Sequence, residues 1–177
     1  DGASFVLNPG GELMAQLPQF ETCVTHIDFV ETADGWRAMP GLRALLPRAI
    51  EADYAAMVMS VRDYLAKTGF KKVLLGLSGG IDSAIVAAIA SDAIGPENVR
   101  CVMLPSQFTS QASLDDASQV AHALGCRLDT VTITGAQGAV GDALAPLFAD
   151  TAPGITEENI QSRLRGLMLM AMSNKFG

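Results

Sequence analysis

The spacing of apolar residues predicts a chain in which strands and helices alternate. Between Pro47 and Gly69 the apolar positions recur at helical intervals, at Ile50, Tyr54, Met57, Val58, Val61 and Leu65. This spacing predicts an amphipathic helix that begins near the proline and ends at the glycine. Farther along, short β-rich runs and helical patterns alternate, with strands predicted at 73–77, 99–104 and 128–133 and helices at 82–93 and 114–124.

Strands that alternate with helices of about 10 to 15 residues imply right-handed βαβ crossovers and therefore a parallel sheet. We predict an α/β fold with a doubly wound, Rossmann-like parallel sheet, in which ligands bind at the carboxyl ends of the strands. Two more helices are predicted at 139–149 and 157–173, the second with Thr156 as its N-cap. Pro153 and Gly154 indicate a loop between them.

The first part of the chain shows a different pattern. Residues 4–7 and 12–17 flank the sequence Asn8-Pro9-Gly10-Gly11, which predicts a β-hairpin with a tight turn. Residues 23–30 predict a further strand. Residues 36–47 show neither a helical nor a strand period and contain Pro and Gly, which is typical of a linker.

The charge pattern also changes along the chain. The first 36 residues contain six acidic side chains and no Lys or Arg, whereas all twelve basic residues lie from Arg37 onward. We therefore predict three parts: a short β segment at 1–36, a linker at 37–52 and an α/β domain at 53–177.

The composition is that of a globular protein, because 49% of the 177 residues are hydrophobic and 18% are charged. No apolar run reaches the roughly 18 residues of a membrane helix, so we expect a soluble protein without a membrane partner. A net charge of −7 with scattered basic residues argues against a nucleic-acid partner, since phosphate binding needs clustered Lys and Arg. Three cysteines without CxxC spacing indicate no disulfide framework, so we expect a reducing, cytoplasmic compartment.

The segment Ser78-Gly79-Gly80-Ile81-Asp82-Ser83 lies between the first strand predicted for the α/β domain and the helix after it. Two adjacent glycines let the backbone turn sharply and approach a ligand, and the unpaired N–H groups of a following helix attract anions. The two serines add hydroxyl donors. Position and composition favour a phosphate site, while a glycine-rich structural turn with a serine cap is the alternative.

Asp82 narrows the choice of ligand. A carboxylate beside a polyphosphate is repulsive unless a divalent cation lies between them, so Asp82 is predicted to hold Mg²⁺. The segment lacks the lysine of the GxxxxGK[ST] loop and the spacing of the GxGxxG motif. The predicted ligand is a complex of Mg²⁺ with a nucleotide polyphosphate.

The residues from Ser78 to Ser83 resemble the pyrophosphate loop of N-type ATP pyrophosphatases, which have an adenine nucleotide alpha hydrolase-like fold and split ATP between its α- and β-phosphates. Motifs farther along resemble glutamine-dependent NAD synthetases: Leu104-Pro105-Ser106, Leu114-Asp115-Asp116-Ala117, residues 158–166 and residues 173–177. Residues 1–30 are similar to the end of the nitrilase-like glutaminase domain that precedes the synthetase in these enzymes.

This resemblance implies sites for ATP and for deamido-NAD. The residues implied in ATP binding are Gly76, Leu77, Ser78, Gly79, Gly80, Ile81, Asp82 and Ser83, with Met103 and Leu104 near the adenine. Asp82 is also the implied Mg²⁺ ligand. Asn159 and Arg163 lie four residues apart and so share a helix face, and the resemblance implies that this face binds deamido-NAD. Arg165 is left open between phosphate binding and solvation.

The resemblance implies a ligase that amidates deamido-NAD to NAD using ATP. The carboxylate of deamido-NAD attacks the α-phosphate, pyrophosphate leaves, and ammonia then displaces AMP from the acyl adenylate, so no protein nucleophile is implied. A linked glutaminase domain supplies the ammonia from glutamine, and a homo-oligomer is expected. Two alternatives stay open: another pyrophosphate-loop amidotransferase similar to GMP synthetase, and a non-catalytic ATP-binding sensor.

Overall fold

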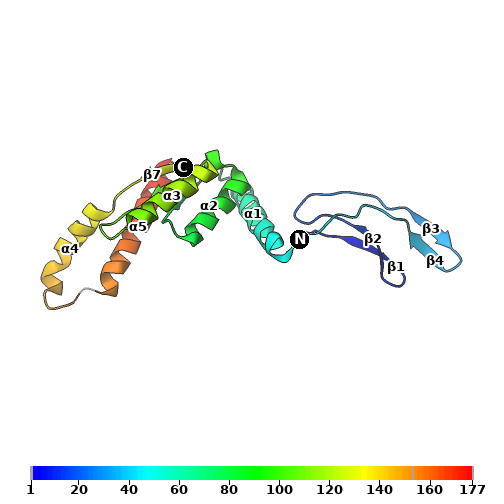
Figure 1. Cartoon of the computed structure of the whole chain (residues 1–177), viewed down its shortest axis with the longest axis horizontal. Helices are drawn as coiled ribbons and strands as arrows, with labels where there is room; N and C mark the ends of the chain where they lie inside the picture. Colours follow the sequence, from blue (N-terminus) through cyan, green and yellow to red (C-terminus); the bar gives the residue numbers. More distant parts are fainter. Residues whose placement is uncertain (1, 153, 177) are drawn as a thin grey trace. The chain divides into compact units, whose positions relative to one another are not determined.

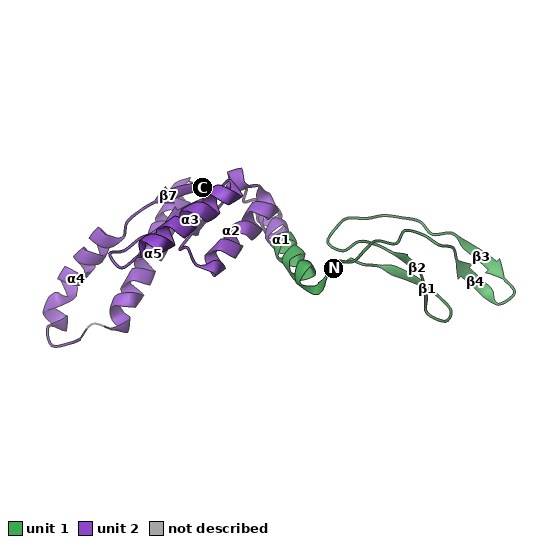
Figure 2. Ribbon diagram, viewed as in Figure 1, with its two compact units in different colours: residues 1–60 green, residues 61–177 purple. Residues whose placement is uncertain are grey.

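The computed structural model describes residues 2–152 and 154–176, and the chain forms two compact units that divide between Ser60 and Val61 (Figure 2). Four short strands come first, followed by a long helix and then by alternating strands and helices (Figure 1). Of the predicted loop, Gly154 precedes the last helix and Pro153 lies outside the described residues. In the described part of the chain, no helix combines the length and the apolar composition that crossing a membrane requires.

The first unit begins with the β-hairpin that the sequence predicts. β1 (Phe5–Asn8) pairs antiparallel with β2 (Glu12–Gln16). Gly10 and Gly11 in the turn between them have φ angles of 94° and 83°. Glycine adopts such angles readily because it has no Cβ, so this prediction is confirmed.

A second hairpin follows, formed by β3 (Phe29–Thr32) and β4 (Gly35–Ala38). The strand predicted at 23–30 is therefore wrong except at its end, and the linker predicted from residue 36 is wrong where β4 lies. All four residues of β3 are exposed, so neither face of the strand has to be apolar. The sequence therefore lacks the alternation of apolar and polar residues by which a half-buried strand is predicted.

The buried side chain of Asn8 joins the two hairpins. Its amide group donates to the Ala38 carbonyl at 3.2 Å, and its carbonyl oxygen accepts from the Ala38 N–H at 2.8 Å. The buried apolar residues of these two hairpins are Met14, Ala15 and Ala38. A buried amide whose donor and acceptor are both hydrogen-bonded stabilises the contact between β1 and β4.

The long helix α1 (Ala49–Thr68) is the amphipathic helix that the apolar spacing predicts. Near its start the Glu51 carboxylate accepts a hydrogen bond from the Arg48 N–H at 2.9 Å. At its end Gly69 has a φ angle of 81°, and its N–H bonds the Leu65 carbonyl at 2.9 Å. The prediction for this helix is confirmed.

The second unit is built on a sheet of three parallel strands, which lie in the order β5 (Val73–Gly76), β6 (Val99–Met103) and β7 (Arg127–Thr130). The connections between them are helical, namely α2 (Ile81–Ile94), the short 3-10 helix η1 (Pro96–Asn98) and α3 (Gln111–Leu124). Each strand neighbours the next one in the sequence. The predicted α/β fold with a parallel sheet is confirmed.

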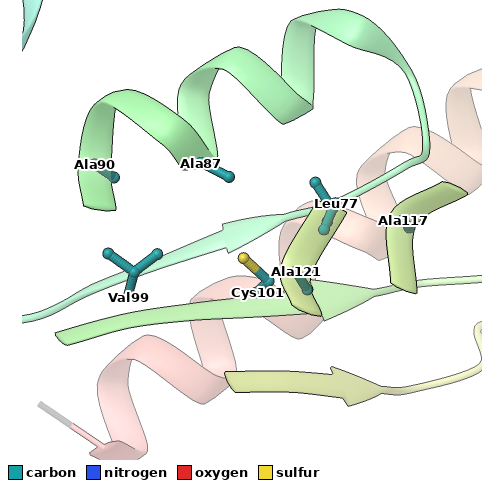
Figure 3. Packing of buried hydrophobic residues seen from close by; sticks show 7 residues of the cluster. All are labelled: Leu77, Ala87, Ala90, Val99, Cys101, Ala117 and Ala121. Carbon is teal, nitrogen blue, oxygen red and sulfur yellow. The ribbon is translucent and has the colours of Figure 1, made fainter. Parts of the chain in front are cut away.

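Helices cover both faces of this sheet. Alternate residues of a strand point to opposite faces, so neighbouring residues of one strand belong to different cores. Leu75 and Cys101 belong to the core on the α2 and α3 side, whereas Leu74 and Val102 pack with α5 (Ile155–Phe176). Small side chains dominate the first core, which Figure 3 shows: Leu77, Ala87, Ala90, Val99, Cys101, Ala117 and Ala121. Alanines on the helices let α2 and α3 approach the strands closely.

Cys101 is fully buried in this core. Burial raises the pKa of the Cys101 thiol to about 12, with smaller contributions from the neighbouring thiol of Cys126. Such a thiol stays protonated at neutral pH and is a poor nucleophile. We therefore assign Cys101 to packing.

The helices α3 and α4 (Thr134–Phe148) begin several residues earlier than the sequence predicts. α3 begins at Gln111, before the predicted residue 114, because the Ser110 hydroxyl accepts a hydrogen bond from the Ser113 N–H and so caps the helix. α4 begins before the predicted residue 139.

The start of α5 also differs from the prediction. The helix begins at Ile155, so Thr156 lies inside it and is not the N-cap. The Glu157 carboxylate instead accepts a hydrogen bond from the Gly154 N–H at 2.5 Å. This bond lowers the pKa of Glu157, because it stabilises the charged form.

Asp129 on β7 links the middle strand to the last one. Its carboxylate accepts hydrogen bonds from Nε of Arg100 at 2.5 Å and from Nη2 of Arg127 at 3.0 Å. These bonds, the one from Arg100 first, hold the pKa of Asp129 below its ordinary value. The Cζ atom of Arg100 also lies 4.2 Å from the ring centre of Phe176, so the same guanidinium holds the end of α5.

Asp129→Asn should lower the free energy of unfolding by about 1 kcal/mol at neutral pH, the upper range for a partly exposed ion pair. Because the folded-state pKa is lowered, the stabilisation is present above the unfolded value of about 3.9 and is lost as the pH falls through the lower folded value. Thermal unfolding of both proteins over a pH series measures this, with the exposed Asp116→Asn as the control. The prediction is contradicted if the difference in Tm between Asp129→Asn and the unmodified protein stays the same as the pH falls below about 4.

Candidate functional site

The segment from Ser78 to Ser83 leaves the sheet at the carboxyl end of β5. The Leu77 N–H bonds the Val102 carbonyl at 2.9 Å, so pairing with β6 continues one residue past the strand. The Leu77 side chain is only 3% exposed and anchors the segment in the core. The segment therefore begins at the sheet edge where doubly wound folds bind their ligands.

Hydrogen bonds among the two serines close this segment into a compact loop. Oγ of Ser83 accepts from the Ser78 N–H at 3.2 Å and donates to the Gly80 carbonyl at 2.9 Å. Oγ of Ser78 lies 3.0 Å from Oγ of Ser83 and accepts from the Gly80 N–H at 3.3 Å. Because Ser83 donates its single hydroxyl proton to the Gly80 carbonyl, Ser78 donates its own proton to Ser83 in the bond between the two hydroxyl groups. Both hydroxyl protons are therefore used within the loop, and the backbone N–H groups that follow it are the donors left for a ligand.

The helix that follows the loop has an open N-terminus. Gly80 is the N-cap of α2, with φ −82° and ψ 153°, and it has no side chain that could accept from the first N–H groups. Those N–H groups and the positive end of the helix dipole remain for a ligand. An anion is the ligand that such a helix start stabilises.

Asp82 lies exposed in the first turn of α2. Within the described residues, no three His, Cys, Asp or Glu side chains lie together in a way that could hold a metal ion. A single carboxylate still suits Mg²⁺, because this ion is commonly bound by one or two carboxylates together with substrate phosphates and water. The donor set therefore fits Mg²⁺ only together with a phosphate ligand.

Gly79 lets the loop pack directly against the first turn of α3. Its φ angle is 80°, and a Cβ built on it would overlap the Ser113 carbonyl oxygen and lie 2.9 Å from the Ser113 Cα. Both atoms belong to the backbone, so no side-chain movement relieves the overlap. Glycine is required here by its conformation and by the close approach of two backbones.

A cavity of about 490 Å³ lies at the carboxyl ends of β5 and β6. The predicted ATP-binding residues that line it are Gly76, Leu77, Ser78, Met103 and Leu104. The other predicted residues of this site continue from Ser78 along the loop into α2 and are not among the lining residues: Gly79, Gly80, Ile81, Asp82 and Ser83. The structure thus brings the ends of two strands and the loop to one place.

Two further walls of the cavity come from residues that we did not assign from the sequence. The segment before α3 and the start of that helix contribute Thr109, Ser110 and Ser113. α5 contributes Arg165, whose Nε donates to the Leu104 carbonyl at 3.1 Å. This bond fixes a half-buried guanidinium at the end of β6, which favours a ligand-binding role over simple solvation.

Asn159 and Arg163 are exposed on α5 and do not line this cavity. Their spacing puts them on one face of the helix, whereas Arg165 and Leu169 lie four residues apart on the face that meets the cavity. Binding of deamido-NAD by Asn159 and Arg163 stays a prediction.

Residues 53–177 match the NAD synthase family. The chain belongs to this family. A glutamine-dependent NAD(+) synthetase from Rhodobacter capsulatus is 62% identical over 177 residues, which are all of this chain and 32% of the relative. The chain therefore spans about a third of the length of the relatives that it matches.

Solved structures of NAD synthetases agree with the fold. The glutamine-dependent NAD+ synthetase from Acinetobacter baumannii, in complex with adenosine diphosphate, is 40% identical with a TM-score of 0.94, and the match covers 100% of this chain and 33% of that chain. The NH3-dependent NAD synthetase from Campylobacter jejuni, in complex with nitrate, is 25% identical with a TM-score of 0.64, over 72% of this chain and 53% of that one.

The two glycines of the NAD synthase loop should respond differently to a methyl group. Gly79→Ala should lower the free energy of unfolding by at least about 2 kcal/mol, because a positive φ costs an L-residue about 1–2 kcal/mol before the overlap with Ser113 is added. Gly80→Ala should lower it by only about 0.5–1 kcal/mol, the cost of alanine at an N-cap, since its φ is negative and its Cβ would meet only Oγ of Ser78 at 3.4 Å. Urea unfolding of both variants measures the difference, and equal stabilities would refute the assigned contact.

Proposed function

We propose that this chain supplies the ATP site and part of the deamido-NAD site of a glutamine-dependent NAD synthetase. The proposal rests on membership of the NAD synthase family and on relatives named as glutamine-dependent NAD synthetases. Because the chain spans about a third of those relatives, we propose that the glutaminase and the remaining synthetase residues belong to the rest of a longer polypeptide.

The observation that carries the proposal is the open N-terminus of α2 beside the cavity. Gly80 leaves the first N–H groups of the helix without a side-chain cap, and the Ser78 hydroxyl lines the cavity next to them. We propose that the β- and γ-phosphates of ATP bind here, where the N–H groups and the helix dipole compensate negative charge. The adenosine then extends toward the end of β6.

We propose that the adenine lies against the backbone of Met103 and Leu104, which line the same cavity. Arg165 supports this arrangement, because its bond to the Leu104 carbonyl holds the end of β6 and leaves the terminal guanidinium nitrogens to donate elsewhere. The guanidinium supplies a fixed positive charge near the position of the α-phosphate.

Asp82 is the proposed Mg²⁺ ligand. The metal would shield the negative charge that accumulates on the leaving pyrophosphate. Asp82 lies in the first turn of α2, the same turn as the N–H groups that we propose bind phosphate. The loop therefore binds and orients the triphosphate, and Asp82 offsets its charge through the metal.

The reaction proposed for this site forms a carbon–nitrogen bond in two steps. The carboxylate of deamido-NAD attacks the α-phosphate and displaces pyrophosphate, which gives an acyl adenylate. Ammonia then attacks the acyl carbon, AMP leaves, and the amide of NAD is formed. The residues of this chain contribute by positioning two anionic reactants and by stabilising the developing charge, and no side chain acts as a nucleophile.

We also propose boundaries for the parts of the chain, an oligomeric state and a location. Residues 1–36 are proposed to end the nitrilase-like glutaminase domain, residues 37–52 to link it to the synthetase, and residues 53–177 to begin the synthetase, which agrees with the family match from residue 53. A homo-oligomer and a cytoplasmic location are proposed from the resemblance and from the cysteine pattern.

Asp82→Asn should lower pyrophosphate release from ATP by about 100-fold, the usual cost of losing one charge-stabilising group. The assay uses the full-length polypeptide with Mg²⁺, deamido-NAD and either glutamine or ammonia. Asp116→Asn removes one exposed carboxylate elsewhere and serves as the control with the same change in net charge. Pyrophosphate release by Asp82→Asn at the control rate would refute the metal assignment.

The same assay separates the alternatives. Pyrophosphate release with xanthosine monophosphate in place of deamido-NAD would favour the GMP synthetase-like amidotransferase. ATP binding without pyrophosphate release for either acceptor would favour the sensor.

Arg163 and Arg165 should affect different substrates. Arg163→Ala should raise the KM for deamido-NAD about tenfold and leave that for ATP unchanged, because a charged hydrogen bond contributes about 1.5–3 kcal/mol. Arg165→Ala should raise the KM for ATP, since the end of β6 loses its support. Steady-state kinetics with each substrate varied in turn measure both effects, and an unchanged KM for deamido-NAD in Arg163→Ala would contradict the assignment of that helix face.

A further inference from the structure

The conformation of the phosphate loop depends on the position of the first turn of α3. The backbone of Gly79 packs so closely on the backbone of Ser113 that a methyl group does not fit between them. α3 begins well after α2 in the sequence, and its first turn touches the loop only through the tertiary fold. A shift of that turn would remove the surface on which Gly79 rests.

Ser110 fixes this turn. Its hydroxyl accepts a hydrogen bond from the Ser113 N–H at 3.2 Å and lies 2.9 Å from the Ser113 hydroxyl. The approach to Ser110 is also held, since Oγ1 of Thr109 accepts from the Ser106 N–H at 3.0 Å and the Thr109 N–H bonds the Ser106 carbonyl at 3.1 Å. The residue that Gly79 contacts is therefore the residue that the cap holds.

The two helix starts at this cavity differ in their caps. α3 is capped by its own serine, whereas the N-cap of α2 is a glycine without a side chain. The N–H groups of α2 are available to a ligand, while the Ser113 N–H is already bonded within α3. The start of α2 can therefore bind a ligand, whereas the start of α3 supports the loop.

We propose that Ser110 is a positioning residue for the phosphate loop: by capping α3 it holds Ser113 against Gly79 and so keeps the loop in its anion-binding form. The inference rests on the proposed function, because the anion is taken to be the triphosphate of ATP. Ser110 acts through Ser113 and Gly79, and its chemistry is that of a helix cap.

Three substitutions of Ser110 separate capping from direct contact with the nucleotide. Ser110→Ala removes the cap and should weaken binding of ATP with Mg²⁺ about five- to tenfold, the equilibrium effect of losing an N-cap. Ser110→Asn restores a good N-cap without a hydroxyl and should bind ATP within about twofold of the unmodified protein. Ser110→Thr keeps both the cap and the hydroxyl. Ser118→Ala, at an exposed position of the same helix, is the matched control.

The measurements are calorimetric titration of ATP with Mg²⁺ into the full-length polypeptide and the KM for deamido-NAD, which should not change. Rescue by Asn supports the positioning role. The positioning role would be overturned if both Ser110→Ala and Ser110→Asn lost affinity for ATP and only Ser110→Thr kept it. That result would indicate a hydroxyl group that contacts the nucleotide. Unchanged ATP affinity in Ser110→Ala would also overturn it.

Hydrogen exchange without nucleotide tests the inference independently of the proposed function. The Ser78 and Gly80 N–H groups, which are hydrogen-bonded within the loop, should exchange at least about fivefold faster in Ser110→Ala than in Ser110→Asn, because the loop loses its support only when the cap is lost. Equal exchange rates would overturn the positioning role even if ATP binds. Faster exchange in a protein that binds no ATP would instead refute the proposed function and leave the structural coupling in place.

Discussion

The parallel pairing of β5 with β6 is the constraint on which the second unit depends. Its register places Gly76 opposite Val102, and the Leu77 N–H extends the pairing by one more bond to the Val102 carbonyl. Both strands therefore end at the same edge, and the segments that follow them must leave the sheet side by side. The cavity, the loop and the start of α3 meet there because the chain has two consecutive parallel strands.

Close packing converts this arrangement into a defined site. Alanines at positions such as 87, 90, 117 and 121 let α2 and α3 approach the sheet on one face. The loop between β5 and α2 then meets the first turn of α3 at Gly79, where two backbones touch. On the opposite face α5 packs against Val102 and Leu104, and the same packing brings Arg165 to the Leu104 carbonyl. The residues around the cavity thus come from elements that are far apart in the sequence.

The sequence reveals those features that depend on local chemistry. The α/β fold of the second unit, the long helix α1 and the first hairpin follow from apolar spacing and turn residues, and the loop at 78–83 follows from its glycines and from Asp82. The prediction fails where burial gives no pattern, as in the exposed strand β3. It also fails at the starts of α3 and α5, where the first helical residue depends on which side chain caps the helix. Ser and Thr occur at many positions where they cap nothing, so the sequence alone does not identify the capping residue.

By itself, the sequence determined which segment has the chemistry of a phosphate-binding loop and which carboxylate we propose for Mg²⁺, because two glycines, a helix start and an acidic side chain lie within six consecutive residues. Only the tertiary structure decided which residues surround that segment. Arg163 and Arg165 differ by two positions on one helix, yet only Arg165 lines the cavity, because the packing of α5 on the sheet selects one helix face. The role of Ser110 likewise depends on the contact between Ser113 and Gly79, which no spacing along the chain encodes.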